Sequence, residues 1–228
     1  MTLPFTDSFP PRPPFPPGPP WPPGRPGQPG EPGPQRQPPA PVAQPTRIWL
    51  DPGGLPGGLC ERLLERRIVM ASGHLDGEAA TRLCAQLLTL DAEGGEPIRL
   101  ELQNLDADLP AALTVMGVLD VVRVPVHAQA GGRISGPALG VLASATRRLA
   151  YPNAVFALAE PKVSFDGRVT ELAAQEEQVR VMLDELYIRL AEVTGREVDD
   201  IRADARRGRL LTAGDAISYG LIQGRAGR

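Results

Sequence analysis

The chain has 228 residues, and 24 basic against 27 acidic side chains give it a formal net charge of −3. This balance offers none of the strong positive charge that attracts nucleic acids or anionic membranes, and no apolar run reaches the roughly 18 to 20 residues of a membrane span. The first residues also lack the basic-then-apolar pattern of a secretory signal. We therefore expect a cytoplasmic protein without nucleic-acid or membrane partners.

Proline is concentrated at the start of the chain, where nineteen of the 27 prolines lie within the first 45 residues. Proline lacks the N–H group that a helix needs, and its ring clashes with the preceding turn. We expect residues 1–46 to form a disordered, locally polyproline II extension, and residues 47–228 to form one domain. The extension is interpreted as solvated chain, with a polyproline ligand anchored on Phe15 and Trp21 as the alternative.

Short apolar runs alternate with longer amphipathic segments in the first half of the expected domain. Residues 68–71 predict a strand, and residues 76–78 open a helix with acidic side chains in its first turn. Residues 98–102 alternate apolar with polar side chains and predict a second strand, followed by a loop at 105–108. Pro110 suits the first turn of the next helix.

A second set of elements follows the same order of strand and helix. Residues 124–129 predict a third strand, which the glycine pair at 131–132 is expected to end. Ser135 is suited to the N-cap of a helix whose first turn contains Pro137. Residues 155–158 predict a fourth strand. Strands that alternate with helices indicate the α/β class.

The strongest helical pattern covers residues 169–193, where apolar side chains recur at intervals of three and four. A helix of this length would span roughly 37 Å. Because a long helix with an apolar stripe usually has a partner, we interpret it as an assembly element. The alternative is that it packs wholly on its own domain.

Titratable side chains suited to metal or redox chemistry are few. Cys60 and Cys84 have no metal-ligand spacing, so we expect reduced thiols, with a disulfide between them as the alternative. The two histidines are His74, which lies just before the first helix, and His127, which lies within the third strand. No pattern predicts a cofactor or a metal site.

Five short strings carry a family resemblance. They are LLERRI at 63–68, AQLLTLD at 85–91, YPN at 151–153, AEVTG at 191–195 and LTAGDAISYGLI at 211–222. In order and spacing they resemble the proteolytic subunit of the ATP-dependent Clp protease. The resemblance implies a ClpP/crotonase-like α/β fold of repeated strand-helix units, in which the helix at 169–193 protrudes as a handle. It also implies stacked seven-membered rings fed by a ring ATPase.

The family places its nucleophilic serine at a strand-to-helix turn, and the matching segment is ambiguous. Counting back from the later strings places Ile134 at this position, whereas counting forward from the Asn104 loop reaches Gly136. Ser135 lies between the two counts and carries a hydroxyl group. We favour a structural role for Ser135 as a helix N-cap, which contributes about 1 kcal/mol.

The other elements of the family's mechanism are altered along ungapped strings. Ala159 in ALAEP stands where the family carries its general-base histidine, and Gly208 in RRGRLLT stands where it carries its aspartate. The oxyanion segment matches residues 104–108, in which both family glycines are missing and Asp106 and Asp108 are present. A carboxylate beside a developing oxyanion would oppose it.

These losses favour a catalytically inactive, structural or regulatory subunit of a Clp-type assembly. It would form homo- or hetero-oligomers with Clp-type subunits, with a Clp ATPase as a further possible partner. Residues 47–62 lack the pattern of the family's gating hairpin, which leaves ATPase docking open. One alternative is an active serine peptidase built on Ser135 and His127. Another is an acyl-coenzyme A enzyme with Asp106 or Asp108 as its acid or base.

Overall fold

The structure, a computed structural model, describes residues 57–161 and 169–227, so the N-terminal extension with Phe15 and Trp21 lies outside the described residues. The chain begins with α1 (Gly57–Leu64), β1 (Ile68–Leu75), α2 (Gly77–Glu93), β2 (Ile98–Ala107), α3 (Leu109–Val121), β3 (Val126–Ser135) and α4 (Ala138–Ala143). It continues with β4 (Arg147–Ala150), β5 (Val155–Ala157), α5 (Val169–Thr194), α6 (Val198–Arg206), β6 (Leu210–Thr212), α7 (Ala213–Tyr219) and β7 (Gly224–Arg225).

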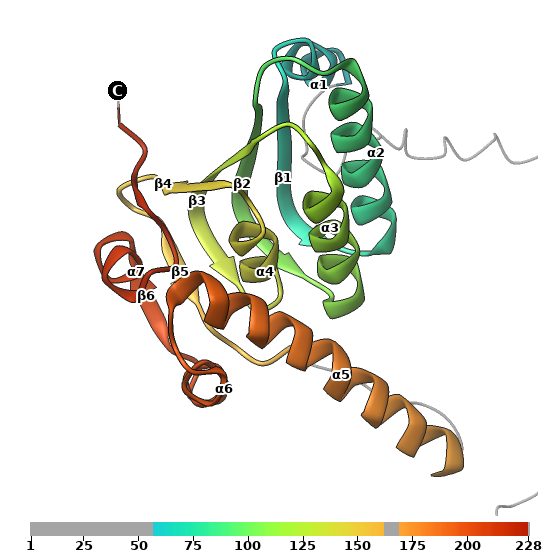
Figure 1. The fold of residues 1–228 in the computed structure, drawn as a ribbon, viewed down its shortest axis with the longest axis vertical. Helices are drawn as coiled ribbons and strands as arrows, with labels where there is room; N and C mark the ends of the chain where they lie inside the picture. Colours follow the sequence, from blue (N-terminus) through green and yellow to red (C-terminus); the bar gives the residue numbers. More distant parts are fainter. Residues whose placement is uncertain (1–56, 162–168, 228) are drawn as a thin grey trace, which may run out of the picture. The chain divides into compact units, whose positions relative to one another are not determined.

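The described strands form one seven-stranded sheet, in which β1, β2, β3, β4 and β7 follow one another (Figure 1). Strand β3 pairs with β4 along its first half and with β5 along its second half. Within the described sheet the pairs are parallel, except that β5 and β6 run antiparallel. The α/β class is thereby confirmed, and the carboxyl ends of β1, β2 and β3 meet at one edge of the sheet.

Strands β2 and β3 are longer than the sequence pattern predicted. The expected loop at 105–108 is strand as far as Ala107, because Asn104 forms a bulge with a left-handed backbone (φ 47°) and pairing resumes beyond it. The glycines at 131–132 do not end β3. They leave space for the side-chain amides of Gln103 and Asn104, with which a Cβ at either glycine would collide.

The predicted N-cap role of Ser135 is wrong. Ser135 ends β3, and the N-cap position of α4 is occupied by Pro137. The Gly136 N–H donates to the Ala157 carbonyl at 3.0 Å, so the bonding between β3 and β5 continues to Gly136 and delays the start of the helix. The turn therefore consists of Gly136 and Pro137.

The predicted helices are found in the structure, and several short elements are additions. Helix α2 begins after Asp76, whose Oδ1 accepts a hydrogen bond from the Ala79 N–H at 2.8 Å. Helix α5 extends from Val169 to Thr194. The elements that were not predicted are short and carry little periodicity; they are α1, β4, α6, β6, α7 and β7.

The long helix α5 packs on the domain through part of its length. Leu186, Tyr187 and Leu190 are buried, whereas Val181 and Ile188 are each 47% exposed. The helix therefore has one face in the core and, on another face, apolar side chains that stay about half exposed. No helix within the described ranges is both long and apolar enough to cross a membrane.

Candidate functional site

A cavity of about 630 Å³ lies at the carboxyl ends of β1, β2 and β3 and beside the segment that follows β5. These strand ends contribute polar side chains, while α3 and α5 contribute apolar ones. The polar lining residues are His74, Asp106, Asp108, Arg133, Ser135 and Glu160, and Leu109, Val179 and Met182 are among the apolar ones. In parallel sheets this edge is the usual place for a ligand, so the cavity is the candidate functional site.

The three candidates for the nucleophile position, which are the residues that the two counts reach and Ser135 between them, have different surroundings. Ile134 is fully buried in β3 between Leu105 and Phe156, so its side chain belongs to the core. Ser135 is half-buried and lines the cavity. Gly136 has a left-handed backbone (φ 56°) and lies at the turn itself. The residue at the strand-to-helix turn is therefore Gly136, which the forward count reaches.

Ala159, which the resemblance matches to the family's base, lies beside this turn, and Gly208, which it matches to the carboxylate, lies in the segment that pairs with the Ala159 segment. A Cβ built on Gly136 would lie 3.6 Å from the Ala159 carbonyl oxygen. The Leu158 N–H donates to the Arg209 carbonyl at 2.9 Å, which brings Gly208 next to Ala159. Gly208 ends α6 with a left-handed backbone (φ 66°) and does not line the described cavity. None of these three residues carries a side chain that can accept or donate a proton.

Ser135 has no base in reach among the described residues. No hydrogen bond connects its Oγ with a described side chain. His127 lies at the other end of β3, eight residue steps from Ser135, which correspond to roughly 26 Å along a strand. The geometry contradicts the alternative in which His127 activates Ser135.

His74 is a site residue to which the sequence pattern assigned no role. Its Nε2 lies 3.1 Å from Asp108 Oδ1, and the two side chains are 55% and 57% exposed. In the sheet, His74 of β1 also lies opposite Asp106 of β2. An exposed pair of this kind contributes little to stability. Only the pairing of β1 with β2 brings the two residues together, so spacing along the chain gave no signal.

Asp106 lies against the turn that would hold a nucleophile. Its Oδ1 would be 3.5 Å from a Cβ on Gly136. Backbone N–H donors stabilise the negative charge that develops during acyl transfer. A carboxylate at this distance has the opposite effect, because it adds negative charge where the reaction would create more.

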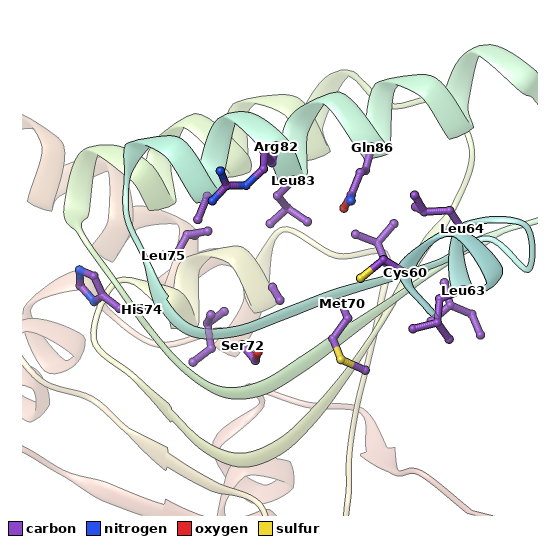
Figure 2. A pocket seen from close by; sticks show the side chains of 15 residues that line it. Cys60, Leu63, Leu64, Met70, Ser72, His74, Leu75, Arg82, Leu83 and Gln86 are labelled. Carbon is purple, nitrogen blue, oxygen red and sulfur yellow. The ribbon is translucent and has the colours of Figure 1, made fainter. Parts of the chain in front are cut away.

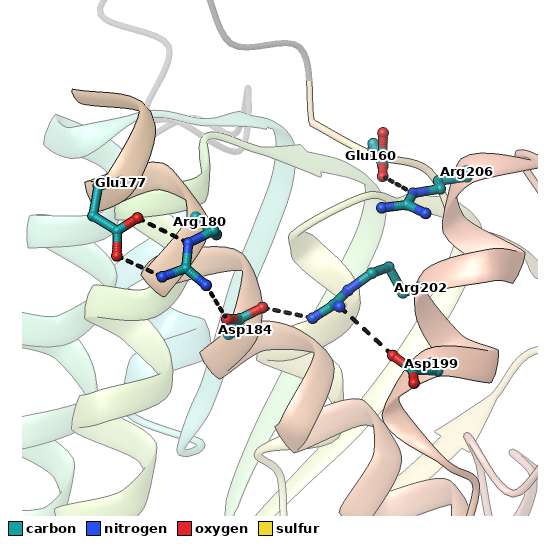
Figure 3. A network of polar contacts seen from close by, with 7 residues as sticks. All are labelled: Glu160, Glu177, Arg180, Asp184, Asp199, Arg202 and Arg206. Atoms are coloured by element: carbon teal, nitrogen blue, oxygen red, sulfur yellow. Dashed lines mark hydrogen bonds and ion pairs between the residues drawn. The ribbon is translucent and has the colours of Figure 1, made fainter. Parts of the chain in front are cut away.

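A network of ion pairs borders the cavity and joins α5 to α6. Glu160, which lines the cavity, lies 3.3 Å from Arg206 of α6. A chain of contacts then connects Glu177, Arg180, Asp184, Arg202 and Asp199 (Figure 3). Burial, with the Glu160 carboxylate as a smaller contribution, raises the pKa of Tyr187 to about 12, so its hydroxyl stays protonated. The network joins α5 to α6 through ion pairs, and we assign it a structural role.

A second, narrower cavity of about 40 Å³ lies between α1, β1 and α2 (Figure 2). Its lining is mostly apolar, and its size suits a water molecule rather than a substrate. Cys60 contributes its sulfur to this cavity, while burial raises the pKa of the Cys84 thiol and keeps it unreactive. No disulfide joins the two described cysteines, which contradicts the alternative pairing.

Comparisons with known proteins identify the family of this chain. A model of the Clp protease family matches residues 58–224. The ATP-dependent Clp protease proteolytic subunit 1 of Mycobacterium tuberculosis is 31% identical over 165 residues, which cover 71% of this chain and 82% of the relative. Subunit 2 of Mycolicibacterium paratuberculosis is 30% identical over 165 residues, with 71% and 83% covered. The chain therefore belongs to the Clp protease family.

Proposed function

We propose that this chain is a non-catalytic subunit of a Clp-type proteolytic assembly. Two observations carry the proposal: Gly136 lies at the strand-to-helix turn within contact distance of the Ala159 carbonyl, and the hydrogen bond from the Leu158 N–H to the Arg209 carbonyl pairs the segment of Ala159 with that of Gly208. The family resemblance assigns the base to Ala159 and the carboxylate to Gly208, and it assigns the nucleophile to Ile134 or Ser135, or to Gly136 by the forward count. Without side chains that transfer a proton, the usual serine mechanism has no route.

The charge of the site supports the same proposal. Asp106 and Asp108 replace the glycine-rich segment whose backbone would stabilise an oxyanion. Removing one oxyanion donor lowers kcat by about 10²- to 10³-fold in a well-studied serine protease. The loss of that segment together with the base leaves little residual catalysis to expect.

The scaffold that remains suits assembly. Helix α5 extends over 26 residues, and Val181 and Ile188 expose apolar surface on it. The two relatives are named as proteolytic subunits, so related subunits are the natural partners. The chain would occupy positions in a ring and alter its gating, its stability or its choice of ATPase.

Co-purification tests this proposal. The tagged full-length chain is co-expressed with the catalytic Clp proteolytic subunits of the same organism, and the recovered complex is analysed by native mass spectrometry. We expect mixed assemblies, and we expect no hydrolysis of fluorogenic peptides by the chain alone. Recovery of the chain free of other subunits at every expression ratio, or peptide hydrolysis by the chain alone, would contradict the proposal.

One observation favours a second candidate, a serine hydrolase. Ser135 and the His74–Asp108 pair line the same cavity. If this candidate is correct, Ser135→Ala and His74→Ala each abolish hydrolysis, whereas Ser218→Ala on the exposed surface of α7 does not. Equal activity in all three variants excludes it. The acyl-coenzyme A alternative gains no support, because the matched family is the Clp protease.

A further inference from the structure

A groove of about 310 Å³ runs between α3 and α5, away from the candidate functional site. Its floor is apolar, with Leu113 and Met116 from α3 and Ile188 from α5. Ile188 is 47% exposed, which is high for a large aliphatic side chain. Gly117 adds space, because a Cβ at this position would meet no heavy atom within 4 Å. The floor can therefore seat an apolar side chain of a partner.

The rim of this groove is acidic. Three acids, Asp120, Glu185 and Glu192, line it together with a single arginine, Arg189. Arg189 donates to both carboxylate oxygens of Asp120 at 2.7 Å, so these two charges neutralise each other. Glu192 lies 3.6 Å from the same guanidinium, and no ion pair connects Glu185 with another described residue. The rim keeps a net negative charge.

We propose that this α3/α5 groove docks a basic amphipathic segment of a partner protein. An apolar side chain of that segment would lie over Gly117 and against Ile188. Arginine or lysine side chains next to it would pair with Glu185 and Glu192. A groove between two helices that combines an apolar floor with a charged rim suits this mode of recognition.

Charge complementarity favours a basic protein segment as the occupant of the groove. Nucleic acid and anionic lipid both present phosphates, which the carboxylates on the rim would repel. A purely apolar segment would leave the net negative charge of the rim, including Glu185, without a compensating cation. A basic segment satisfies the floor and the rim together. The proposal concerns a surface remote from Ser135 and Ala159, so it does not depend on whether the chain hydrolyses peptides.

Fluorescence anisotropy tests the groove with the full-length protein. The probe is a labelled helical peptide that carries leucine on one face and arginine beside it, and the matched peptide has glutamate in place of arginine. Gly117→Trp fills the groove without a change in charge, and Glu185→Lys reverses one rim charge. We expect each variant to weaken binding of the arginine peptide about tenfold, and we expect salt to weaken it further.

The control variant is Glu176→Lys, which changes the charge of α5 by the same amount at an exposed residue outside the groove. It should leave the affinity within about twofold of the unmodified protein. Circular dichroism and sedimentation velocity establish that the variants are folded. The proposal is overturned if the arginine peptide fails to bind, if all three variants weaken it equally, or if Gly117→Trp changes only self-association.

Discussion

Gly136 has a backbone conformation that residues other than glycine rarely adopt. Its φ of 56° lies in the left-handed region, where a residue other than glycine costs about 1–3 kcal/mol. The space around it is adequate, since a Cβ would lie at ordinary contact distance from Asp106 and from the Ala159 carbonyl. A serine can therefore be placed here, but it would face a carboxylate.

We predict that restoring the three family side chains is not enough for catalysis. A variant with Gly136→Ser, Ala159→His and Gly208→Asp should hydrolyse fluorogenic peptides at least about 100-fold more slowly than the same variant with Asp106→Gly added. The reason is the electrostatic opposition of Asp106 to the oxyanion. Steady-state kinetics of the two purified variants measure the ratio. Equal rates above background would show that Asp106 does not oppose the reaction.

Asp91 is the buried carboxylate of α2 that holds the start of β3. It accepts hydrogen bonds from the backbone N–H groups of Val124 at 3.0 Å and Arg123 at 2.8 Å, and from the Arg123 side chain at 3.2 Å. The Val124 N–H, followed by the contacts with Arg123, holds the pKa of Asp91 below its ordinary value. The ionised form therefore stabilises the folded state.

The pH dependence of stability follows from this shift. Because folding lowers the pKa, the contribution of Asp91 is present above its unfolded pKa of about 3.9 and is lost as the pH falls through the folded value. We predict that Asp91→Asn lowers the free energy of unfolding at neutral pH, and that the deficit shrinks at a pH of about 3. Urea titrations at both pH values measure it. A deficit that does not change with pH would contradict the prediction.

At the scale of elements, two helical glycines have opposite roles. A Cβ on Gly140 of α4 would lie 2.5 Å from Leu186 Cδ1 and 2.5 Å from Met116 Sδ, so the glycine allows α4 to approach α3 and α5 closely. Gly117 of α3 faces open space. The same substitution at the two positions separates the effect of packing from that of helix propensity.

We predict that Gly140→Ala lowers the free energy of unfolding by about 1–3 kcal/mol, because Leu186 and Met116 must shift. Gly117→Ala should raise it by about 0.5–1 kcal/mol, because alanine favours the helix and meets no neighbour. Chemical denaturation of both variants gives the two differences. A stabilising effect of Gly140→Ala would mean that the packing of α4 is looser than the structure indicates.

The described C-terminal elements are joined by a polar cluster. The Tyr219 hydroxyl donates to Asp204 Oδ2 at 2.8 Å, and Arg209 Nη1 donates to the same carboxylate at 2.9 Å. The guanidinium of Arg196 lies 4.0 Å from the centre of the Tyr219 ring. These contacts connect α6 with α7 and place β6 against β5. Gly208 is thereby held beside Ala159.

At the scale of the whole molecule, the exposed apolar side chains on α5 favour assembly. We predict that Val181→Glu raises the dissociation constant of self-association or mixed association about tenfold, because it places a charge in an apolar contact. Sedimentation velocity over a concentration series measures it. Gln178→Glu, also exposed on α5, is the control and should leave the constant unchanged. Equal effects of both substitutions would exclude Val181 from the interface.

Sequence patterns predicted the elements whose signals are local. Helix α5 is marked by the spacing of its apolar residues, and α2 by Asp76 at its N-cap. The extent of β3 was not predictable, because the glycines at 131–132 were expected to break it. Their actual role depends on Gln103 and Asn104 of the neighbouring strand. That contact joins residues far apart in the chain.

The amino-acid sequence was enough to predict the α/β class and the resemblance to the Clp protease family, because these rest on short-range periodicity and on short strings in a fixed order. It also predicts Ala159 and Gly208 at two of the family's site positions, because the strings that contain them are ungapped. Only the tertiary structure shows that Gly136 lies at the turn. The forward and backward counts along the sequence disagree, and the left-handed backbone angle of Gly136 identifies the turn. The tertiary structure also decided that Asp106 faces Gly136 and that His74 meets Asp108. These contacts follow from the lateral pairing of β1, β2 and β3, which spacing along one chain segment does not encode.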